Sequence, residues 1–190
     1  MQVFGVYSRK QSTTQAVRSI CKDTTIRTIL HMKEIVLNTI VKVCAYDELS
    51  TDDRSLVDAA RQATKSSYAP YSHFNVGAAV RLAGGEIVCG SNQENAAYPS
   101  GLCAERTALF SAGASHPDEA VEAMAIAARN QDGELTRPIS PCGACRQVML
   151  ETETRFSSAM RIILYGAECC YIIEGGAKEL LPISFDADFL

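Results

Sequence analysis

Three cysteines in two short segments constrain the fold of this chain most. Cys103 stands in Cys103-Ala104-Glu105, and the other two stand in Pro141-Cys142-Gly143-Ala144-Cys145. Both segments follow expected loops and open expected helices. Cysteines three positions apart share one face of the first helical turn and can bind one ion together. If all three thiols bind the same ion, the fold must bring two helix starts to one point.

A helix N-terminus favours metal binding by cysteine. Its unpaired amide protons and positive dipole end lower the pKa of a thiol and favour the thiolate that zinc requires. Three thiolates leave one tetrahedral position for water, as in catalytic zinc sites, where the pKa of water falls from about 15.7 to about 7. The sequence therefore predicts one Zn²⁺ held by Cys103, Cys142 and Cys145. Arg106 and Arg146 are placed to offset the remaining negative charge.

Glu105 is the candidate for proton transfer at this site. A residue two positions after Cys103 points about 200° away on a regular helix, so both side chains reach one ion only near the helix mouth. A carboxylate there can take a proton from water and deliver it to a substrate, which contributes about 10² to 10⁴ in rate. We therefore predict Glu105 as the catalytic residue.

The cysteine pair has other interpretations. Alone, Cys142 and Cys145 fit a redox pair or half of a zinc ribbon about as well, and the segment at Cys103 favours the shared site. The other cysteines and the histidines have no partner at ligand spacing. We interpret them as incidental or buried thiols and as surface or turn residues: Cys21, Cys44, Cys89, Cys169, Cys170, His31, His73 and His116.

The hydrophobic pattern alternates helices with strands after an initial hairpin. Residues 50–53 have the capping-box pattern, and Gly84-Gly85 joins two apolar runs as a hairpin turn. The expected elements are a strand over 35–43, a helix from 50, strands over 76–83 and 86–89, a helix over 100–110, a strand over 123–128, a helix over 141–151 and a strand over 162–165. This order predicts an α/β fold, a three-layer α/β/α sandwich around a mixed, about five-stranded sheet.

Composition and charge limit the partners. The chain has 190 residues, of which 47% are hydrophobic, enough for one core. Its net charge is −4 although residues 1–31 are basic, so the remainder is more acidic than the whole. An acidic body repels a phosphate backbone, and we expect a small uncharged substrate and no nucleic acid. Without a membrane-spanning run or a secretory signal, we expect no membrane partner and a cytoplasmic location.

Residues 1–31 differ from the rest of the chain. They are rich in Ser and Thr, almost free of acidic residues, and show no sustained helix or strand period. We therefore expect an extension over residues 1–31 that is disordered, a targeting segment or a mis-assigned start, with the mis-assigned start favoured. A single domain is expected over residues 32–190.

Taken with longer stretches of sequence, these segments resemble the zinc nucleoside deaminases, and within them the small homotetrameric cytidine deaminases. The resemblance extends over residues 47–185 and includes residues 68–72, 74–79, 92–106, 141–147 and 180–182. The general zinc deaminase signature has His-x-Glu followed by Pro-Cys-x-x-Cys. This chain has Cys103 in place of that histidine, as is usual in the tetrameric subgroup. The resemblance implies a cytidine deaminase-like fold.

The resemblance also implies a reaction and a set of roles. The reaction is hydrolytic deamination of cytidine and deoxycytidine to uridine and deoxyuridine with release of ammonia, in pyrimidine salvage. The implied partners are a nucleoside substrate and a homotetramer with sites at subunit interfaces. The implied site residues are the zinc ligands Cys103, Cys142 and Cys145, the proton shuttle Glu105, Arg106 at a zinc-bound thiolate, Phe74 on the pyrimidine, Asn92 and Glu94 on the ribose 3′-hydroxyl, the backbone of Ala104 at the polar edge of the base, Phe185 from a neighbouring subunit, and Tyr98 near that junction.

Other interpretations stay open at this point. The same chemistry on another cytosine-bearing molecule, such as blasticidin S, would leave Asn92 and Glu94 without the purpose that ribose recognition gives them. A noncatalytic zinc-binding module predicts a fourth ligand and no need for Glu105. A nucleic-acid editor is disfavoured by the acidic body. Outside their motifs, Phe74 and Phe185 would fit core positions and Asn92 a turn.

Overall fold

A computed structural model of the chain describes residues 33–190. The chain divides into a unit that ends at Ile40 and a unit over Val41–Leu190, and the fold below is that of the second unit. Residues 33–40 form neither helix nor strand. The extension expected over residues 1–31 lies outside the described residues, so the domain boundary stays a prediction. Over residues 33–190, no helix is long and apolar enough to cross a membrane.

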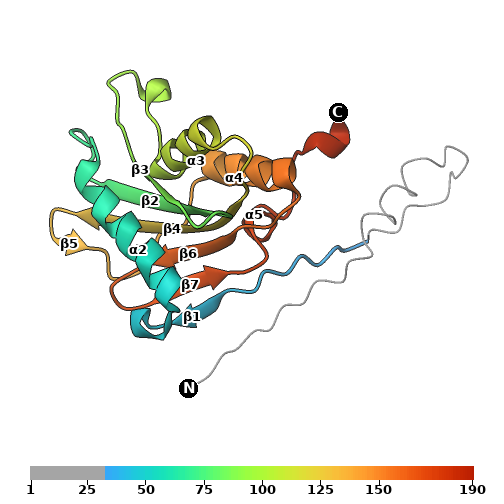
Figure 1. Ribbon diagram of the computed structural model, residues 1–190, viewed down its shortest axis with the longest axis horizontal. Coiled ribbons are helices and arrows are strands. Elements are labelled where there is room, and N and C mark those ends of the chain that lie inside the picture. The colour runs from blue at the N-terminus through green and yellow to red at the C-terminus, as the bar shows by residue number, and fades with distance from the viewer. Residues whose placement is uncertain (1–32) are drawn as a thin grey trace, which may run out of the picture. The chain divides into compact units, whose positions relative to one another are not determined.

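A mixed sheet forms the centre of the unit over Val41–Leu190 (Figure 1). In this unit it has seven strands in the order β1-β7-β6-β4-β2-β3, with β5 paired to β4. Only β4 and β6 pair in parallel, and the other pairs are antiparallel. The strands are β1 (Lys42–Cys44), β2 (Asn75–Leu82), β3 (Ile87–Ser91), β4 (Val121–Asn130), β5 (Gly133–Glu134), β6 (Arg161–Tyr165) and β7 (Cys170–Ile173).

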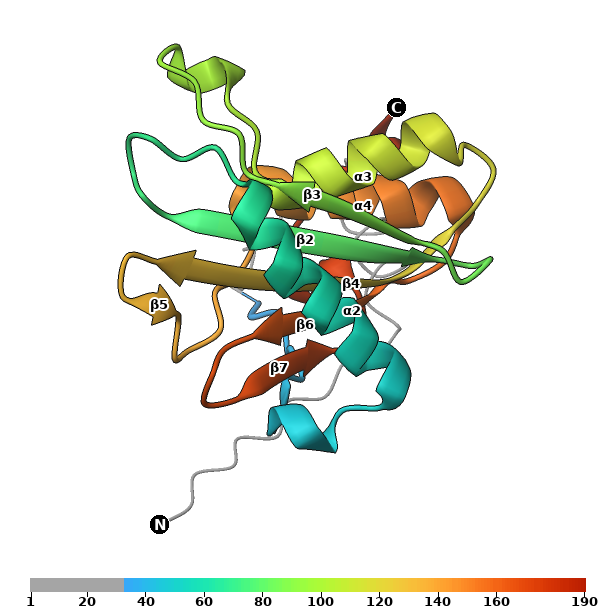
Figure 2. The same cartoon turned by 60° about the vertical axis from the view of Figure 1, so that its left-hand side comes forward.

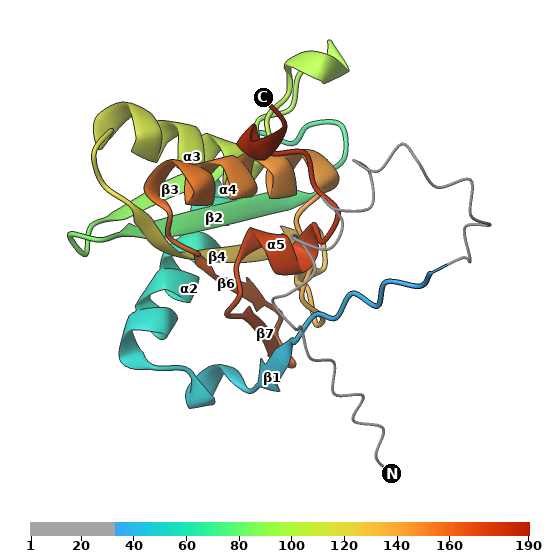
Figure 3. The same ribbon diagram turned by 90° about the vertical axis from the view of Figure 1, so that its right-hand side faces the viewer.

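Helices cover both faces of this sheet. α2 (Thr51–Ala63) packs on one face, and α3 (Ala104–Ser115), α4 (Gly143–Phe156) and α5 (Ala177–Leu180) pack on the other. Figures 2 and 3 show α2 separated by the sheet from α3 and α4. Each face has its own buried cluster, with Leu56 and Val57 on the α2 side and Met149 and Leu150 on the α4 side. The predicted three-layer α/β/α sandwich is confirmed.

Two local predictions are confirmed in detail. The Ser50 Oγ accepts a hydrogen bond from the Asp53 backbone N–H at 3.1 Å, which caps α2 as the sequence pattern indicates. The turn between β2 and β3 has Gly85 at a φ of 88°, a value that favours glycine. These two features set the first helix and the hairpin on which the site is built.

The number and lengths of the strands differ from the prediction. The sheet of this unit has seven strands where about five were expected, and the two that were not expected, β5 and β7, are only two and four residues long. The strand expected over 35–43 is reduced to Lys42–Cys44, which pairs with β7 alone at the sheet edge. Strands this short leave too few alternating positions for a period to be seen.

The helix expected from Ser100 begins later. Ser100 lies in a 3₁₀ turn, and α3 begins at Ala104 with Cys103 as its N-cap residue. The reason is a backbone bridge: Leu102 both donates to and accepts from the backbone of Gln93, at 3.0 and 2.8 Å. Leu102 must be extended to make these bonds, so the helix starts after it.

The helix expected from Pro141 begins with Gly143 and runs to Phe156, five residues beyond the predicted end. Cys142 is its N-cap residue. Ser157, at a φ of 52°, ends the helix in the left-handed conformation. No glycine follows the end of α4, so the sequence carries no C-cap signal there. The predicted end of this helix was therefore too early.

We predict that Gly90→Ala destabilises the fold by about 1–3 kcal/mol. A Cβ at position 90 would lie 2.3 Å from the backbone nitrogen of Ala108 and 2.6 Å from the carbonyl oxygen of Ala104, both in α3. Urea unfolding measures the change. Gly113→Ala is the control, in the helix α3 that Gly90 contacts, because its Cβ would meet nothing closer than 3.8 Å. It should be neutral or stabilising by about 0.5–1 kcal/mol. Equal stability of the two variants would contradict the prediction.

Candidate metal centre

The three predicted ligand cysteines lie together at two helix starts. Cys103 and Cys142 are the N-cap residues of α3 and α4, and Cys145 lies in the first turn of α4. The Sγ atoms of Cys103 and Cys142 are 3.8 Å apart, and those of Cys142 and Cys145 are 3.5 Å apart. Zn–S bonds of about 2.3 Å in a tetrahedral site place two sulfurs about 3.8 Å apart. The trio therefore has the spacing that zinc requires.

The thiols are electrostatically unequal. A hydrogen bond from Cys145, together with the Arg106 Nη2 at 3.6 Å from the Cys103 Sγ, lowers the pKa of Cys103 to about 5. The hydrogen bond with Cys103 and burial raise the pKa of Cys145. The pKa of Cys103 is thus lowered and that of Cys145 raised, and a bound metal ion would take the place of thiol protons in this cluster.

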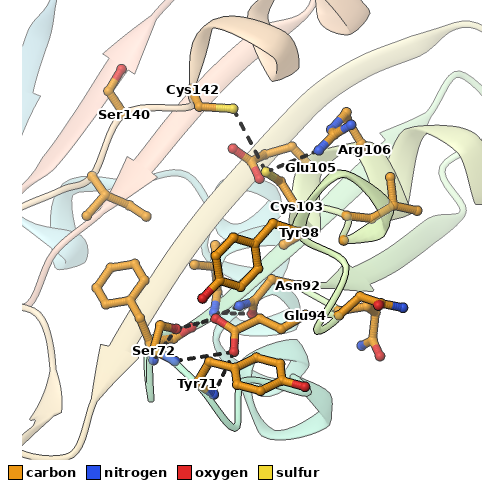
Figure 4. Close-up of a pocket in the computed structure, with 18 residues that line it drawn as sticks. Tyr71, Ser72, Asn92, Glu94, Tyr98, Cys103, Glu105, Arg106, Ser140 and Cys142 are labelled. Carbon is orange, nitrogen blue, oxygen red and sulfur yellow. Dashed lines mark hydrogen bonds between the residues drawn. The ribbon is translucent and has the colours of Figure 1, made fainter.

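Glu105 lies in the first turn of α3, beside the cysteines. Cys103 has an extended backbone with φ −73° and ψ 154°, so it precedes the helix and the 200° separation of a regular helix does not apply. Both residues line one cavity, and Figure 4 shows the Glu105 carboxylate at the end where Cys103 and Cys142 lie. The Glu105 side chain is 5% exposed, and this burial raises its pKa.

The cavity beside the cysteines has a volume of about 810 Å³. Its two ends differ in chemistry: Figure 4 shows Cys103, Cys142, Glu105 and Arg106 at one end, and Ser72, Asn92 and Glu94 at the other. The site residues expected from the sequence that line it are Phe74, Asn92, Glu94, Tyr98, Cys103, Ala104, Glu105, Arg106 and Cys142. A concave site of this size is typical of small-molecule binding.

Two predicted site residues do not line the cavity. Cys145 is fully buried, and its sulfur lies within 4.8 Å of those of Cys103 and Cys142. Phe185 is 61% exposed and stacks on Phe189 with ring centroids 5.8 Å apart. If the Phe185 ring takes part in substrate binding, it must therefore do so at a cavity other than the one in its own chain.

The Asn92 side chain has a defined orientation. Its Oδ1 accepts from the Val76 backbone N–H at 2.7 Å and from the Ser67 hydroxyl at 2.5 Å, and its Nδ2 donates to the Phe74 carbonyl at 2.9 Å. If the Asn92 amide were turned so that its oxygen and nitrogen exchanged places, the Val76 N–H would face a second donor instead of an acceptor. One Nδ2 proton is left over beyond the bond to Phe74.

Two serines of this network were not predicted from the sequence. Ser67 contacts Asn92, and Ser72 contacts Glu94 from the segment that precedes β2. Ser72 falls inside a stretch with family resemblance, but neither serine belongs to a charge cluster or a metal-ligand spacing. Their role depends on a contact between segments about 20 residues apart, which spacing alone does not reveal.

Comparison with known proteins gives consistent results. Residues 50–160 match the family model described as the cytidine and deoxycytidylate deaminase zinc-binding region. A cytidine deaminase of Halalkalibacterium halodurans is 42% identical over 137 residues, which cover 72% of this chain and 96% of that protein. One of Sporosarcina psychrophila is 43% identical over 100 residues, which cover 53% of this chain and 69% of that protein.

The fold is also similar to solved structures. The crystal structure of a cytidine deaminase from Burkholderia pseudomallei aligns with a TM-score of 0.60 at 39% identity, over 69% of this chain and 97% of that one. That of a Mycobacterium tuberculosis cytidine deaminase aligns with a TM-score of 0.56 at 29% identity, over 72% and 99%. The matched region contains all three cysteines. Together with their spacing, this assigns zinc to Cys103, Cys142 and Cys145.

We predict that Cys142→Ala removes zinc from the purified protein, because two thiolates do not complete the site. Metal content by mass spectrometry should fall from about one zinc per chain to a small fraction of that. Cys89→Ala is the matched control, since Cys89 is an exposed thiol on β3 outside the trio, and it should keep its zinc. Full zinc in the Cys142 variant would contradict the assignment.

Proposed function

The chain belongs to the cytidine and deoxycytidylate deaminase family, and on that premise we propose that it hydrolyses the exocyclic amine of cytidine and deoxycytidine. The products are uridine or deoxyuridine and ammonia, which places the reaction in pyrimidine salvage. One observation supports the proposal above all: a buried carboxylate, Glu105, and the thiols Cys103 and Cys142 line the same cavity as Asn92 and Glu94.

The metal end of the cavity provides the chemistry. Zinc held by the three cysteines supplies, when bound, an activated water as the nucleophile that attacks C4 of cytosine. Glu105 moves one proton of that water to N3 of the ring, where it stays in the product, and then moves the remaining proton from the new C4 hydroxyl to the leaving amine. Arg106, whose Nη2 lies near the Cys103 sulfur, offsets the negative charge of the thiolates.

The other end of the cavity suits a sugar hydroxyl. Asn92 has a spare N–H donor, and Glu94 is an acceptor whose pKa is lowered by a hydrogen bond from Ser72 and by the Tyr71 backbone N–H. A hydroxyl group both accepts and donates, so a donor and an acceptor side by side are complementary to it. The proposed ligand is the ribose 3′-hydroxyl. Among cytosine-bearing substrates, this favours a nucleoside over one that lacks the sugar.

The base is proposed to lie between these two ends. The Phe74 ring, which is half-buried at the cavity wall, packs on the pyrimidine. Ala104 is the first residue of α3, so its backbone N–H has no partner within the helix. This N–H is available to the polar edge of the base, one residue before Glu105.

The proposed assembly is a homotetramer of the small cytidine deaminase subgroup, with sites at subunit interfaces. Tyr98 is 79% exposed and Phe185 is 61% exposed, so both rings are available for contact with another chain. Phe185 is proposed to close the cavity of a neighbouring subunit, and Tyr98 to lie near that junction.

We predict that Glu105→Gln keeps zinc and loses turnover by about 10² to 10⁴, because the amide cannot move a proton. Ammonia release from cytidine, deoxycytidine and cytosine is measured beside zinc content, and the unchanged protein should convert the two nucleosides in preference to the free base. Glu122→Gln, at an exposed position of β4, is the matched control and should retain full activity. A fully active Glu105 variant would remove Glu105 from the mechanism.

We predict that the protein sediments with four times the mass of one chain.

We predict that Phe185→Ala raises KM for cytidine roughly tenfold, because an aromatic contact with the substrate is lost. Phe185→Ala and Glu105→Gln subunits, dissociated and reassembled together, should regain activity. An assembly of either variant alone lacks Phe185 or Glu105 at every site. The mixed assembly of the two variants places an intact Glu105 beside a Phe185 from another subunit. No recovery in verified mixed tetramers, or a monomeric active enzyme, would exclude the shared site.

A further inference from the structure

Glu94 is held by the segment that leads into β2. Its Oε2 accepts from the backbone N–H groups of Tyr71 and Ser72, at 2.9 and 3.3 Å, and its Oε1 accepts from the Ser72 hydroxyl. Figure 4 shows these contacts at the end of the cavity away from the cysteines. The carboxylate direction is therefore set by two consecutive residues.

The two carboxylate oxygens are not equally occupied. A carboxylate oxygen can accept about two hydrogen bonds. Oε2 already accepts two, whereas Oε1 accepts one, from the Ser72 hydroxyl. Oε1 is thus the oxygen of Glu94 with capacity for a ligand, and Ser72 is the residue that contacts it.

The Ser72 hydroxyl has a second contact that fixes its own orientation. It accepts from the Phe74 backbone N–H at 3.1 Å while its single proton is donated to Glu94. One hydroxyl group therefore connects the carboxylate at the sugar end with the backbone of the residue proposed to pack on the base. Loss of this group would release Oε1 and leave the Phe74 N–H without that partner.

Asn92 differs from Glu94 in this respect. Two of its three contacts are to the backbone of Phe74 and Val76, so its orientation depends on β2 and the residue before it. For Glu94, the backbone N–H groups hold only Oε2. The Ser72 side chain is the contact that directs Oε1.

We propose that Ser72 is a positioning residue for sugar recognition: its hydroxyl directs Glu94 Oε1 to accept a hydrogen bond from the 3′-hydroxyl of the nucleoside. This inference rests on the proposed function and adds a residue to it. Ser72 does not touch the reacting atoms, so its effect is on substrate binding and not on the chemical step.

The test compares KM and kcat on three substrates. Ser72→Ala should raise KM about tenfold for cytidine and for 2′-deoxycytidine, which both have a 3′-hydroxyl, with kcat changed by no more than about twofold. For 2′,3′-dideoxycytidine, which lacks this group, KM should stay within about twofold of the unchanged protein.

A second pair of variants isolates the hydroxyl from the shape of the side chain. Ser72→Thr and Ser72→Val have nearly the same volume, and Ser72 is exposed, so both can be accommodated. The threonine variant should recover most of the affinity for cytidine, and the valine variant should behave as Ser72→Ala does. In a Glu94→Ala background, adding Ser72→Ala should change KM little, because the two residues act through one contact.

Ser115→Ala is the matched control, since the Ser115 hydroxyl only contacts the Ser111 carbonyl within α3. An equal rise in KM for cytidine and for 2′,3′-dideoxycytidine in the Ser72→Ala variant, or a fall in its kcat, would overturn the inference. Either result would indicate a general effect on the loop. An unchanged KM would overturn the inference as well. Failure of the proposed function gives a different result, because the unchanged protein would then release no ammonia from any of the nucleosides.

Discussion

The site depends on the meeting of two helix N-termini at one edge of the sheet. β2 is antiparallel to both β3 and β4, so β3 and β4 run in the same direction, and β6 is parallel to β4. Strands that run in the same direction need a crossover, and α3 and α4 are those crossovers. Helix α3 follows the carboxyl end of β3, and α4 lies in the connection that leaves the carboxyl end of β4 by way of the short β5. α/β proteins commonly bind ligands at this end of the strands. The positive ends of two helix dipoles face the same three thiols.

Small residues determine how closely α3 approaches the sheet. Gly90 on β3 lies directly against the backbone of Ala104 and Ala108, so the helix packs with no side chain between it and the strand. The same first turns of α3 contain the backbone N–H of Ala104 and the side chain of Glu105. The position of the Glu105 carboxylate relative to the cysteines therefore depends on a packing contact between α3 and β3, within a core where small changes in volume are felt.

Sequence reasoning predicted those parts of the molecule that local chemistry determines. The Ser50 cap, the glycine hairpin and the cysteine spacing each act over a few residues, and each appears as expected. The start of α3 was misplaced because a long-range backbone bridge between Gln93 and Leu102 competes with the local capping signal of Ser100. The contact of Ser72 with Glu94 was not predicted for the same reason. Contacts of this kind between distant segments are set by the fold and leave no period in the sequence, unlike the meeting of Cys103 with Cys142, which the metal-ligand motif indicates.

The charges along the cavity favour a neutral ligand. Three thiolates with a divalent cation have a net charge of −1. One cationic side chain among the described residues lines the cavity, that of Arg106, and it lies against Cys103. At the far end, Glu94 is an ionised acceptor held by backbone and hydroxyl donors. A phosphate on the sugar would approach this carboxylate, and among the described residues that line the cavity no cation besides Arg106 is present to offset it. Like charges at close range disfavour binding. A free nucleoside, which offers hydroxyl donors to Glu94 and adds no charge, is the better match. This agrees with the acidic balance of the chain as a whole.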